Sequence, residues 1–267
     1  MTISVQTLGK FDVRVRGRRI RCSGWGSPSA EMLCKILLTY RDEPVEKGWL
    51  QAQLWPELPT IASRQRLEWT VTQLQWLLNG AGETDEFVIQ AGARTVCLRS
   101  DNLTIDGQRL LEATWLDPAA DGAVAELERA DELYCGPYLP DELNAPWSWA
   151  ERERLEVAYE TVLLKLADAY ALRGKHHSAI LVCQSTLIAN PTCEAAAARL
   201  MAWTYQFGNN AQGLEVYGEL CAWLDGEGRR RPTRALSLMA DRLRQGLPLQ
   251  HTELLRPSAV RLAQFTT

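Results

Sequence analysis

Acidic and basic side chains alternate in one stretch whose residue types could do acid–base chemistry. Glu151, Glu153 and Glu156 lie among Arg152 and Arg154. Paired carboxylates can exchange protons with a substrate. Charges of alternating sign three and four residues apart are, however, typical of a solvated helix face, where they form ion pairs. We therefore predict a solvated face here rather than a catalytic acid and base.

Residue sets for other kinds of catalysis are not recognisable. The chain has three histidines, of which His176 and His177 are adjacent in a predicted turn, and a zinc site would need further ligands at suitable spacing. No Gly-x-x-x-x-Gly-Lys-Ser/Thr run occurs, so no phosphate-binding loop of that kind is expected. The sequence predicts no catalytic residue, no cofactor, no metal ligand and no enzyme activity.

The stretch from Thr60 to Asn79 has residue types that could contact DNA. It contains no proline or glycine and is predicted to form one helix. Arg66 lies on its outward face and could pair with a phosphate or with guanine. Thr70 and Gln73 border the same face and could also donate hydrogen bonds to DNA. Each of the three could equally be a solvated side chain.

Two tryptophans on this helix compete with that interpretation. Trp69 and Trp76 are two helical turns apart, so that they share the outward face. They could pack under the wing or against the second domain, contact sugars or thymine methyl groups of DNA, or form a protein interface, because exposed aromatic pairs often mark one. The sequence leaves these three alternatives open.

Basic residues outside the helix are further candidates for DNA contact. Lys47 begins the preceding predicted helix, Arg94 lies in a turn between two predicted strands, and Arg99 follows the second strand. A basic cluster near the N-terminus is either a solvated strand face or a surface that faces phosphates. It consists of Arg14, Arg16, Arg18, Arg19 and Arg21.

Composition places the chain among water-soluble globular proteins. It has 267 residues and a net charge of −4, and no apolar run approaches the roughly 18 residues of a membrane helix. Residues 1–106 hold 13 basic and 12 acidic side chains, and residues 107–267 hold 16 and 21. Seven scattered cysteines without a Cys-x-x-Cys pair indicate reduced thiols and hence a cytoplasmic protein. Because no run is long enough to cross a membrane, no membrane partner is expected.

The elements that must position these residues begin with strands. Alternating apolar residues predict a hairpin over residues 3–8 and 11–16 and a short strand near Ile20. A helix capped by Ser27 follows, then a helix between Pro44 and Pro56, the helix over residues 60–79 ended by Gly80 and Gly82, and a hairpin over residues 87–99. This order predicts a winged helix-turn-helix with an N-terminal strand platform.

From about residue 107 the pattern becomes helical and repeats. Gly174 and Gly208 are 34 residues apart, and each separates two predicted helices that carry aromatic and small residues. A period of about 34 residues is the tetratricopeptide signature. The helices are expected near residues 107–115, 121–135, 147–173, 176–189, 192–207, 210–224 and 232–245.

Several stretches resemble a known family in the order in which that family has them. They are LGKFDVRVRGRRI, LLTYRDEPVEKGWLQAQLWPE, LERADELYCGPYLPDEL, WAERERLEVAYETVLLKLADAYALRG and NPTCEAAAARLMAWTYQFGNNAQGLEVY. On these residues the chain resembles transcriptional activators of the Streptomyces antibiotic regulatory protein type over residues 1 to about 245. Such proteins join an OmpR-like winged helix to a bacterial transcriptional activator domain of tetratricopeptide-like helices. The resemblance implies binding to direct repeats in promoter DNA and contact with RNA polymerase.

Two departures from the family pattern concern charge. The resemblance implies arginines near the end of the third helix, where this chain has Gln73 and Gln75. Glutamine keeps hydrogen bonding but removes the charge that dominates DNA affinity. The run Arg229 to Arg231 also differs from the usual end of the activator domain.

We therefore carry two functional hypotheses. In the first, residues 1–106 form a winged helix that binds DNA, and residues 107–250 mediate RNA polymerase contact and self-association as a homodimer, with residues 251–267 as a tail. The fold class is mainly α with a small β component. In the second, the protein is a non-enzymatic adaptor whose winged helix has become a protein-binding module through Trp69 and Trp76.

Overall fold

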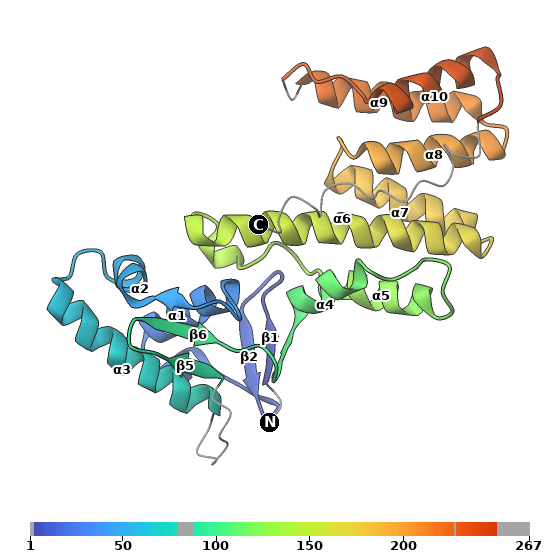
Figure 1. Cartoon of the computed structure of the whole chain (residues 1–267). Helices are drawn as coiled ribbons and strands as arrows, with labels where there is room; N and C mark the ends of the chain where they lie inside the picture. The colour runs from blue at the N-terminus through green and yellow to red at the C-terminus, as the bar shows by residue number, and fades with distance from the viewer. Residues whose placement is uncertain (1–2, 80–87, 227, 250–267) are drawn as a thin grey trace. The chain divides into compact units, whose positions relative to one another are not determined.

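The computed structural model describes residues 3–79, 88–226 and 228–249, without the side chains of residues 22 and 79 (Figure 1). Two compact units account for the chain. The first holds residues 1–111 and 133–156, and the second holds residues 112–132 and 157–267. Each unit therefore combines segments that are distant in the sequence.

A four-stranded sheet begins the first unit. Its order is β3-β2-β1-β7, with β1 at Ile3–Gln6, β2 at Asp12–Val15, β3 at Arg18–Arg19 and β7 at Leu103–Ile105. The predicted N-terminal hairpin and short third strand are confirmed. The parallel pairing of β7 with β1 was not predicted, because it joins strands about a hundred residues apart and has no local signal.

Three helices follow the first three strands. After a short 3-10 turn, η1 at Cys22–Trp25, come α1 at Pro28–Thr39, α2 at Lys47–Leu54 and α3 at Thr60–Asn79. The Ser27 hydroxyl accepts a hydrogen bond from the Ala30 N–H (3.2 Å), which satisfies a free donor at the start of α1. Contacts of α3 with both α1 and α2 close this three-helix core.

A second small sheet completes the winged helix. Strand β4 (Val45–Glu46) pairs with β6 (Thr95–Leu98), and β6 pairs with β5 (Ile89–Ala91). The β5–β6 hairpin is the wing, and β5 contacts α3 (Figure 1). The predicted hairpin is confirmed from residue 88 onward. Residue 87 and the predicted helix stops Gly80 and Gly82 lie outside the described residues.

Residues 133–156 return to the first unit and pack near the end of β1. Tyr138 is buried and forms an isolated antiparallel β-bridge with Leu8. Its hydroxyl lies 2.8 Å from the Thr39 hydroxyl. Gly9, with φ +76°, donates its N–H to the Pro137 carbonyl (3.0 Å). A Cβ atom at residue 9 would lie 2.5 Å from the Cys135 carbonyl oxygen, so only glycine fits there.

One arginine holds this returning segment together. Arg152, near the start of α6, donates to the carbonyl oxygens of Tyr138 (3.2 Å), Glu142 (3.1 Å) and Leu143 (3.3 Å), and to the Ser148 hydroxyl (2.9 Å). The segment contains two short 3-10 turns, η2 at Pro140–Glu142 and η3 at Pro146–Ser148. The guanidinium therefore supplies hydrogen-bond donors to three backbone carbonyls of this compact loop.

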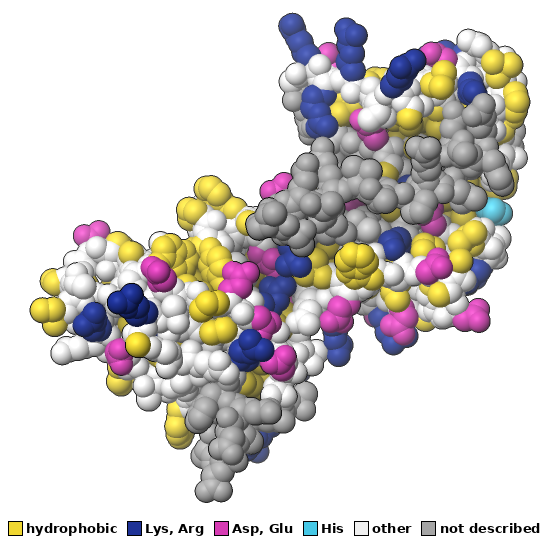
Figure 2. Space-filling view, viewed as in Figure 1, with side chains coloured by type: hydrophobic (Ala, Val, Ile, Leu, Met, Phe, Trp, Pro, Cys, Tyr) yellow, Lys and Arg dark blue, Asp and Glu magenta, His cyan; other side chains and the backbone are white. Residues whose placement is uncertain are grey.

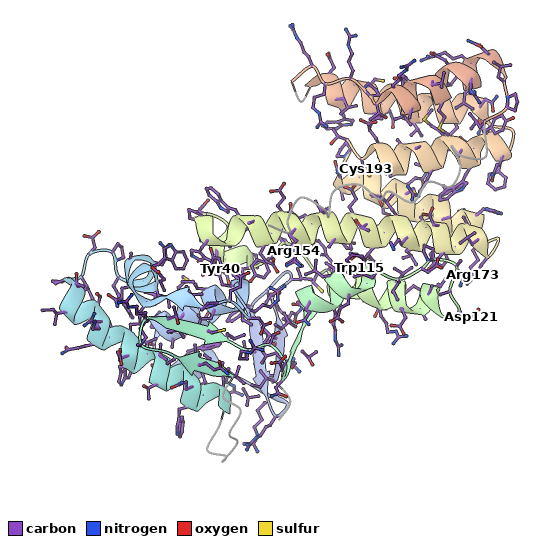
Figure 3. All side chains as sticks on the ribbon, in the orientation of Figure 1. Tyr40, Trp115, Asp121, Arg154, Arg173 and Cys193 are labelled. Atoms are coloured by element: carbon purple, nitrogen blue, oxygen red, sulfur yellow. The ribbon has the colours of Figure 1, made fainter. Side chains whose placement is uncertain are left out.

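Helices build the second unit. The other helices that the structure describes are α4 at Asp106–Ala113, α5 at Ala123–Leu133, α6 at Trp149–Leu172, α7 at His176–Ala189, α8 at Glu194–Gln206, α9 at Asn210–Gly226 and α10 at Arg234–Gln245. Of these, α4 lies mostly in the first unit and α6 begins in it. These match the predicted helices to within a few residues at each end. Arg173, at the end of α6, donates to the carbonyls of Pro118 (2.8 Å) and Ala120 (2.6 Å) before α5 (Figure 3).

The helical repeat is visible in the backbone hydrogen bonds. At Gly174, the next residue donates its N–H to the Tyr170 carbonyl (2.9 Å), and at Gly208 the next residue donates to the Thr204 carbonyl (2.9 Å). Both glycines have φ +73°. A left-handed glycine with this long-range hydrogen bond is the Schellman helix end, here repeated after 34 residues.

Small residues let the repeat helices approach closely. Ala179 is fully buried, and Gly213 occupies the equivalent position 34 residues later. A Cβ atom at residue 213 would lie 2.8 Å from the Thr204 hydroxyl and 3.5 Å from the Met201 Cα. The fold is thus mainly α with a small β component, and a winged helix is followed by a tetratricopeptide-like helical domain, as predicted.

Three cysteines are core residues rather than reactive thiols. Cys34, Cys183 and Cys193 are buried, and burial raises the pKa of each thiol to about 12. Within the described ranges, every cysteine whose side chain is placed is a free thiol. No helix in those ranges is long and apolar enough to cross a membrane.

Candidate nucleic-acid interface

Helix α3 buries one face and exposes a wide arc. The predicted inward residues Leu67, Val71, Leu74 and Leu78 are all buried. Exposed residues are not limited to the predicted outward stripe, because Arg64 and Gln65 are also exposed.

Two predicted DNA contacts are exposed and have no charged partner. Arg66 lies on the outer face of α3, and its guanidinium carbon is 5.9 Å from the centre of the Trp55 ring. Arg94 lies in the wing turn, where only its carbonyl is engaged, by the Lys47 N–H (2.8 Å). Among the residues that the structure describes, neither side chain forms an ion pair. Both guanidinium groups are available to an anion.

Two other predicted contacts are already paired. The Lys47 ammonium lies 3.2 Å from Glu68 on α3. Arg99 donates to Asp101 (3.2 Å) and lies 3.8 Å from Asp42. A DNA phosphate would have to compete with these carboxylates, so the structure favours Lys47 and Arg99 less than Arg66 and Arg94 as DNA contacts.

Thr70 is placed differently from the prediction. Its side chain is 1% exposed, and its hydroxyl donates to the Arg66 carbonyl (2.8 Å) within α3. A DNA contact requires an accessible hydroxyl. Thr70 is therefore corrected to an inward, structural position, because the buried arc of the helix extends one residue beyond the leucine stripe.

The two glutamines of α3 contact the protein. Gln75 donates its amide hydrogen to the Ile89 carbonyl on β5 (2.9 Å) and so fastens the wing to α3. Gln73 is partly buried against Gly26, where a Cβ atom would lie 1.6 Å from the glutamine amide nitrogen. The Gln73 side-chain oxygen is buried and has no partner among the described residues. The Gln73 side chain therefore packs against the protein and is not presented to DNA.

The two tryptophans are displayed. Trp69 is 58% exposed and Trp76 is 72% exposed, so neither packs under the wing. Packing under the wing is thus excluded, whereas packing against the second domain, a DNA contact and a protein interface remain open.

The N-terminal basic cluster is partly neutralised. Arg19 and Arg14 lie 2.8 Å and 3.5 Å from the carboxylate of Asp12, a buried residue on β2. These two of the five arginines are therefore ion-paired, which makes the cluster a weaker candidate for phosphate contact than Arg66 and Arg94.

The carboxylates and histidines considered for catalysis have structural surroundings. Glu151 is buried rather than solvated, and it pairs with Arg41 (2.7 Å) and Arg154 (3.3 Å). His176 begins α7 and packs edge-on against Phe207, with ring centres 5.3 Å apart. Within the described part of the chain, no three His, Cys, Asp or Glu residues are grouped as metal ligands.

An exposed arginine on α3 was not singled out from the sequence. Arg64 lies two residues before Arg66 and is exposed on the same helix. Two arginines two residues apart at Arg64 and Arg66 would have indicated a basic surface. The prediction missed Arg64 because it considered only one outward stripe of the helix.

A winged helix followed by a tetratricopeptide-like helical domain is the class of protein that this fold defines. The family model of the bacterial transcriptional activator domain matches residues 104–244, more than half of the chain. The chain belongs to this family, which assigns it to the transcriptional regulators. A search of curated proteins gave no match.

One solved structure has a similar fold over almost the whole chain. It is Mycobacterium tuberculosis EmbR in complex with a low-affinity phosphopeptide, with a TM-score of 0.81 and 21% sequence identity. The match covers 94% of this chain and 68% of that chain. At this identity the similarity establishes only the fold. The phosphopeptide is a ligand of EmbR.

Proposed function

We propose that the protein is a cytoplasmic transcriptional activator that binds promoter DNA through α3 and the wing. The observation that carries this proposal is the pair of exposed, unpaired guanidinium groups of Arg66 and Arg94 on the two elements that a winged helix presents to DNA. Family membership supports it, because the helical domain is one that transcriptional activators carry.

The division of roles follows the sequence analysis. Residues 1–106 are proposed to bind DNA at direct repeats. Residues 107–250 are proposed to contact RNA polymerase and a second copy of the chain, while residues 251–267 are a tail outside the described residues. Stacked helical repeats leave an extended surface for protein recognition, which supports this assignment.

Binding to DNA fragments from upstream of the protein's own gene cluster tests the proposal. Fluorescence anisotropy of the full-length chain should show affinity that falls steeply as salt rises, because bound phosphates release counterions. Absence of salt-sensitive binding to every such fragment contradicts the proposal.

Arg66→Ala is expected to weaken DNA binding about tenfold and to lower the salt slope by about 0.9 if Arg66 neutralises one phosphate. If Arg66 instead binds guanine, discrimination at one base position should relax by about 1–3 kcal/mol. Anisotropy titrations at several salt concentrations measure both effects. Arg109→Ala, which removes an exposed arginine from α4, is the matched control and should leave affinity unchanged. Equal effects of the two variants would contradict the assigned role of Arg66.

A second candidate function rests on the exposed tryptophans. Trp69 and Trp76 present a large aromatic surface on the same arc of α3. Aromatic residues are enriched at the energetically important centres of protein interfaces. In this alternative the winged helix is a protein-binding module of an adaptor, and DNA is not its partner.

The double variant Trp69→Ala, Trp76→Ala separates the two functions. Because both side chains are exposed, its free energy of unfolding should stay within roughly 1 kcal/mol of the wild type. The variant is assayed for DNA binding by anisotropy and for RNA polymerase binding by pull-down. Reduced DNA affinity with unchanged polymerase binding supports the DNA function of α3. If the wild type does not bind DNA and the double variant no longer binds RNA polymerase, the adaptor function is supported. A variant unchanged in both assays shows that this face serves neither function.

A further inference from the structure

The connection between α9 and α10 concentrates positive charge on the second unit. It carries Arg229, Arg230, Arg231 and Arg234, all exposed, which we call the arginine cluster. From residue 176 to residue 228, the only lysine or arginine is Arg199. Lys and Arg side chains accordingly project from the α9–α10 end of the second unit in Figure 2. The cluster stands out against a segment that is otherwise poor in basic residues.

Three members of the cluster have no side-chain partner in the described structure. Arg229, Arg231 and Arg234 form neither an ion pair nor a side-chain hydrogen bond there. Other arginines of the unit are paired with carboxylates: Arg129 lies 2.8 Å from Glu126, Arg199 2.7 Å from Asp168 and Arg244 2.7 Å from Asp241. Unpaired like charges this close repel each other, so the cluster favours a partner with several negative charges.

The backbone that carries the cluster is anchored. The Arg230 N–H donates to the Leu224 carbonyl of α9 (3.0 Å). The Thr233 N–H donates to the Glu194 carboxylate at the start of α8 (2.9 Å). These bonds hold the segment against two helices of its own unit. A presented surface of this kind loses less conformational entropy on binding than a free loop.

The composition of the segment favours phosphate over a protein surface. From Arg229 to Arg234 the only apolar residue is Pro232, so the segment lacks the aromatic or aliphatic anchor of most protein interfaces. Guanidinium groups bind phosphate oxygens through paired hydrogen bonds. Protein–DNA interfaces are more polar and more positively charged than protein–protein interfaces.

We propose that the arginine cluster is a second DNA-contact surface, in which the helical domain binds backbone phosphates of duplex DNA independently of base sequence. The proposal rests on the proposed DNA-binding function and adds to the winged helix a contact that strengthens affinity without specifying sequence.

The salt dependence of DNA binding tests the cluster. The probe is a fluorescein-labelled duplex of the promoter fragment that the full-length protein binds, alongside a mixed-sequence duplex of equal length. The test variant is Arg229→Gln, Arg231→Gln. The matched control is Arg129→Gln, Lys175→Gln, which removes the same charge from exposed positions of the same unit. Glutamine stays polar but carries no charge, and exposed positions are expected to tolerate it, which circular dichroism verifies.

The test variant should reduce the slope of log affinity against log salt by about 1.8, or about 0.9 for each phosphate that the protein no longer neutralises. Affinity at low salt should fall about tenfold or more for both duplexes, and their ratio should stay constant. The control should behave as wild type. If the wild type binds DNA but the test variant keeps its slope and affinity, the inference is wrong and the cluster faces an acidic protein instead. If the wild type does not bind DNA, the proposed function itself fails, and the inference fails with it.

Discussion

Replacing Asp168 by alanine is expected to lower the free energy of unfolding of the second unit by about 3–5 kcal/mol. The Asp168 carboxylate on α6 accepts two hydrogen bonds of 2.7 Å from the Arg199 guanidinium on α8. Both side chains are largely buried. Burial opposes the charge of Arg199, yet the bond to Asp168 raises the pKa of the guanidinium above its ordinary value. Without Asp168 this charge remains buried and uncompensated.

Urea unfolding followed by far-ultraviolet circular dichroism measures this loss, and hydrogen exchange shows where it occurs. The double variant Asp168→Leu, Arg199→Leu is the control, because removing both charges avoids an unpaired one and often costs little. We expect it to be more stable than Asp168→Ala alone. A single variant that unfolds like wild type contradicts the role of the pair.

Replacing Asp106 by alanine is expected to destabilise the first unit by about 3–5 kcal/mol, because each buried polar group left without a partner costs about 1–3 kcal/mol. The Asp106 carboxylate accepts hydrogen bonds from the Thr7 N–H (2.8 Å), the Thr7 hydroxyl (2.7 Å), the Leu8 N–H (2.9 Å) and the Gly107 N–H (2.8 Å). Asp106 and Thr7 are both buried. The variant therefore releases the end of β1 from the start of α4.

Hydrogen exchange of Asp106→Ala should show lost protection in β1 and β7 while α7 to α10 stay protected. Asp168→Ala should show the reverse pattern, so each variant is the control for the other. Asp106→Asn keeps one acceptor oxygen and should lose less stability than alanine. Loss of protection throughout the chain in either variant would contradict an independent core for each unit.

Local patterns were sufficient to predict the helices and the two hairpins, but not the short strands β4 and β7. The helix over residues 60–79 is found at those bounds, because a run without proline or glycine and with a 3.6-residue apolar period leaves few alternatives. The 34-residue repeat was readable from Gly174 and Gly208, because each must adopt a left-handed conformation to end a helix. Resemblance added the bacterial transcriptional activator domain, which the match to residues 104–244 establishes.

The availability of individual side chains was not readable from the sequence. Arg66 and Lys47 both carry a positive charge, yet Lys47 forms an ion pair with Glu68 on α3 and Arg66 forms none among the described residues. Gln73 and Gln75 look like exposed polar residues, but Gly26 and the Ile89 carbonyl lie against them. Thr70 is one residue from a buried leucine stripe, and the packing of α3 places it inside.

The sequence by itself determined the order of the elements, the repeat period and the residues that could carry charge to DNA, because these depend on neighbours in the chain. Only the tertiary structure decided that residues 133–156 pack with the first unit and that β7 pairs with β1. It also decided which arginines are neutralised and which are free. The physical reason is that ion pairs, burial and parallel strand pairing are set by contacts between distant residues, for which local periodicity contains no signal.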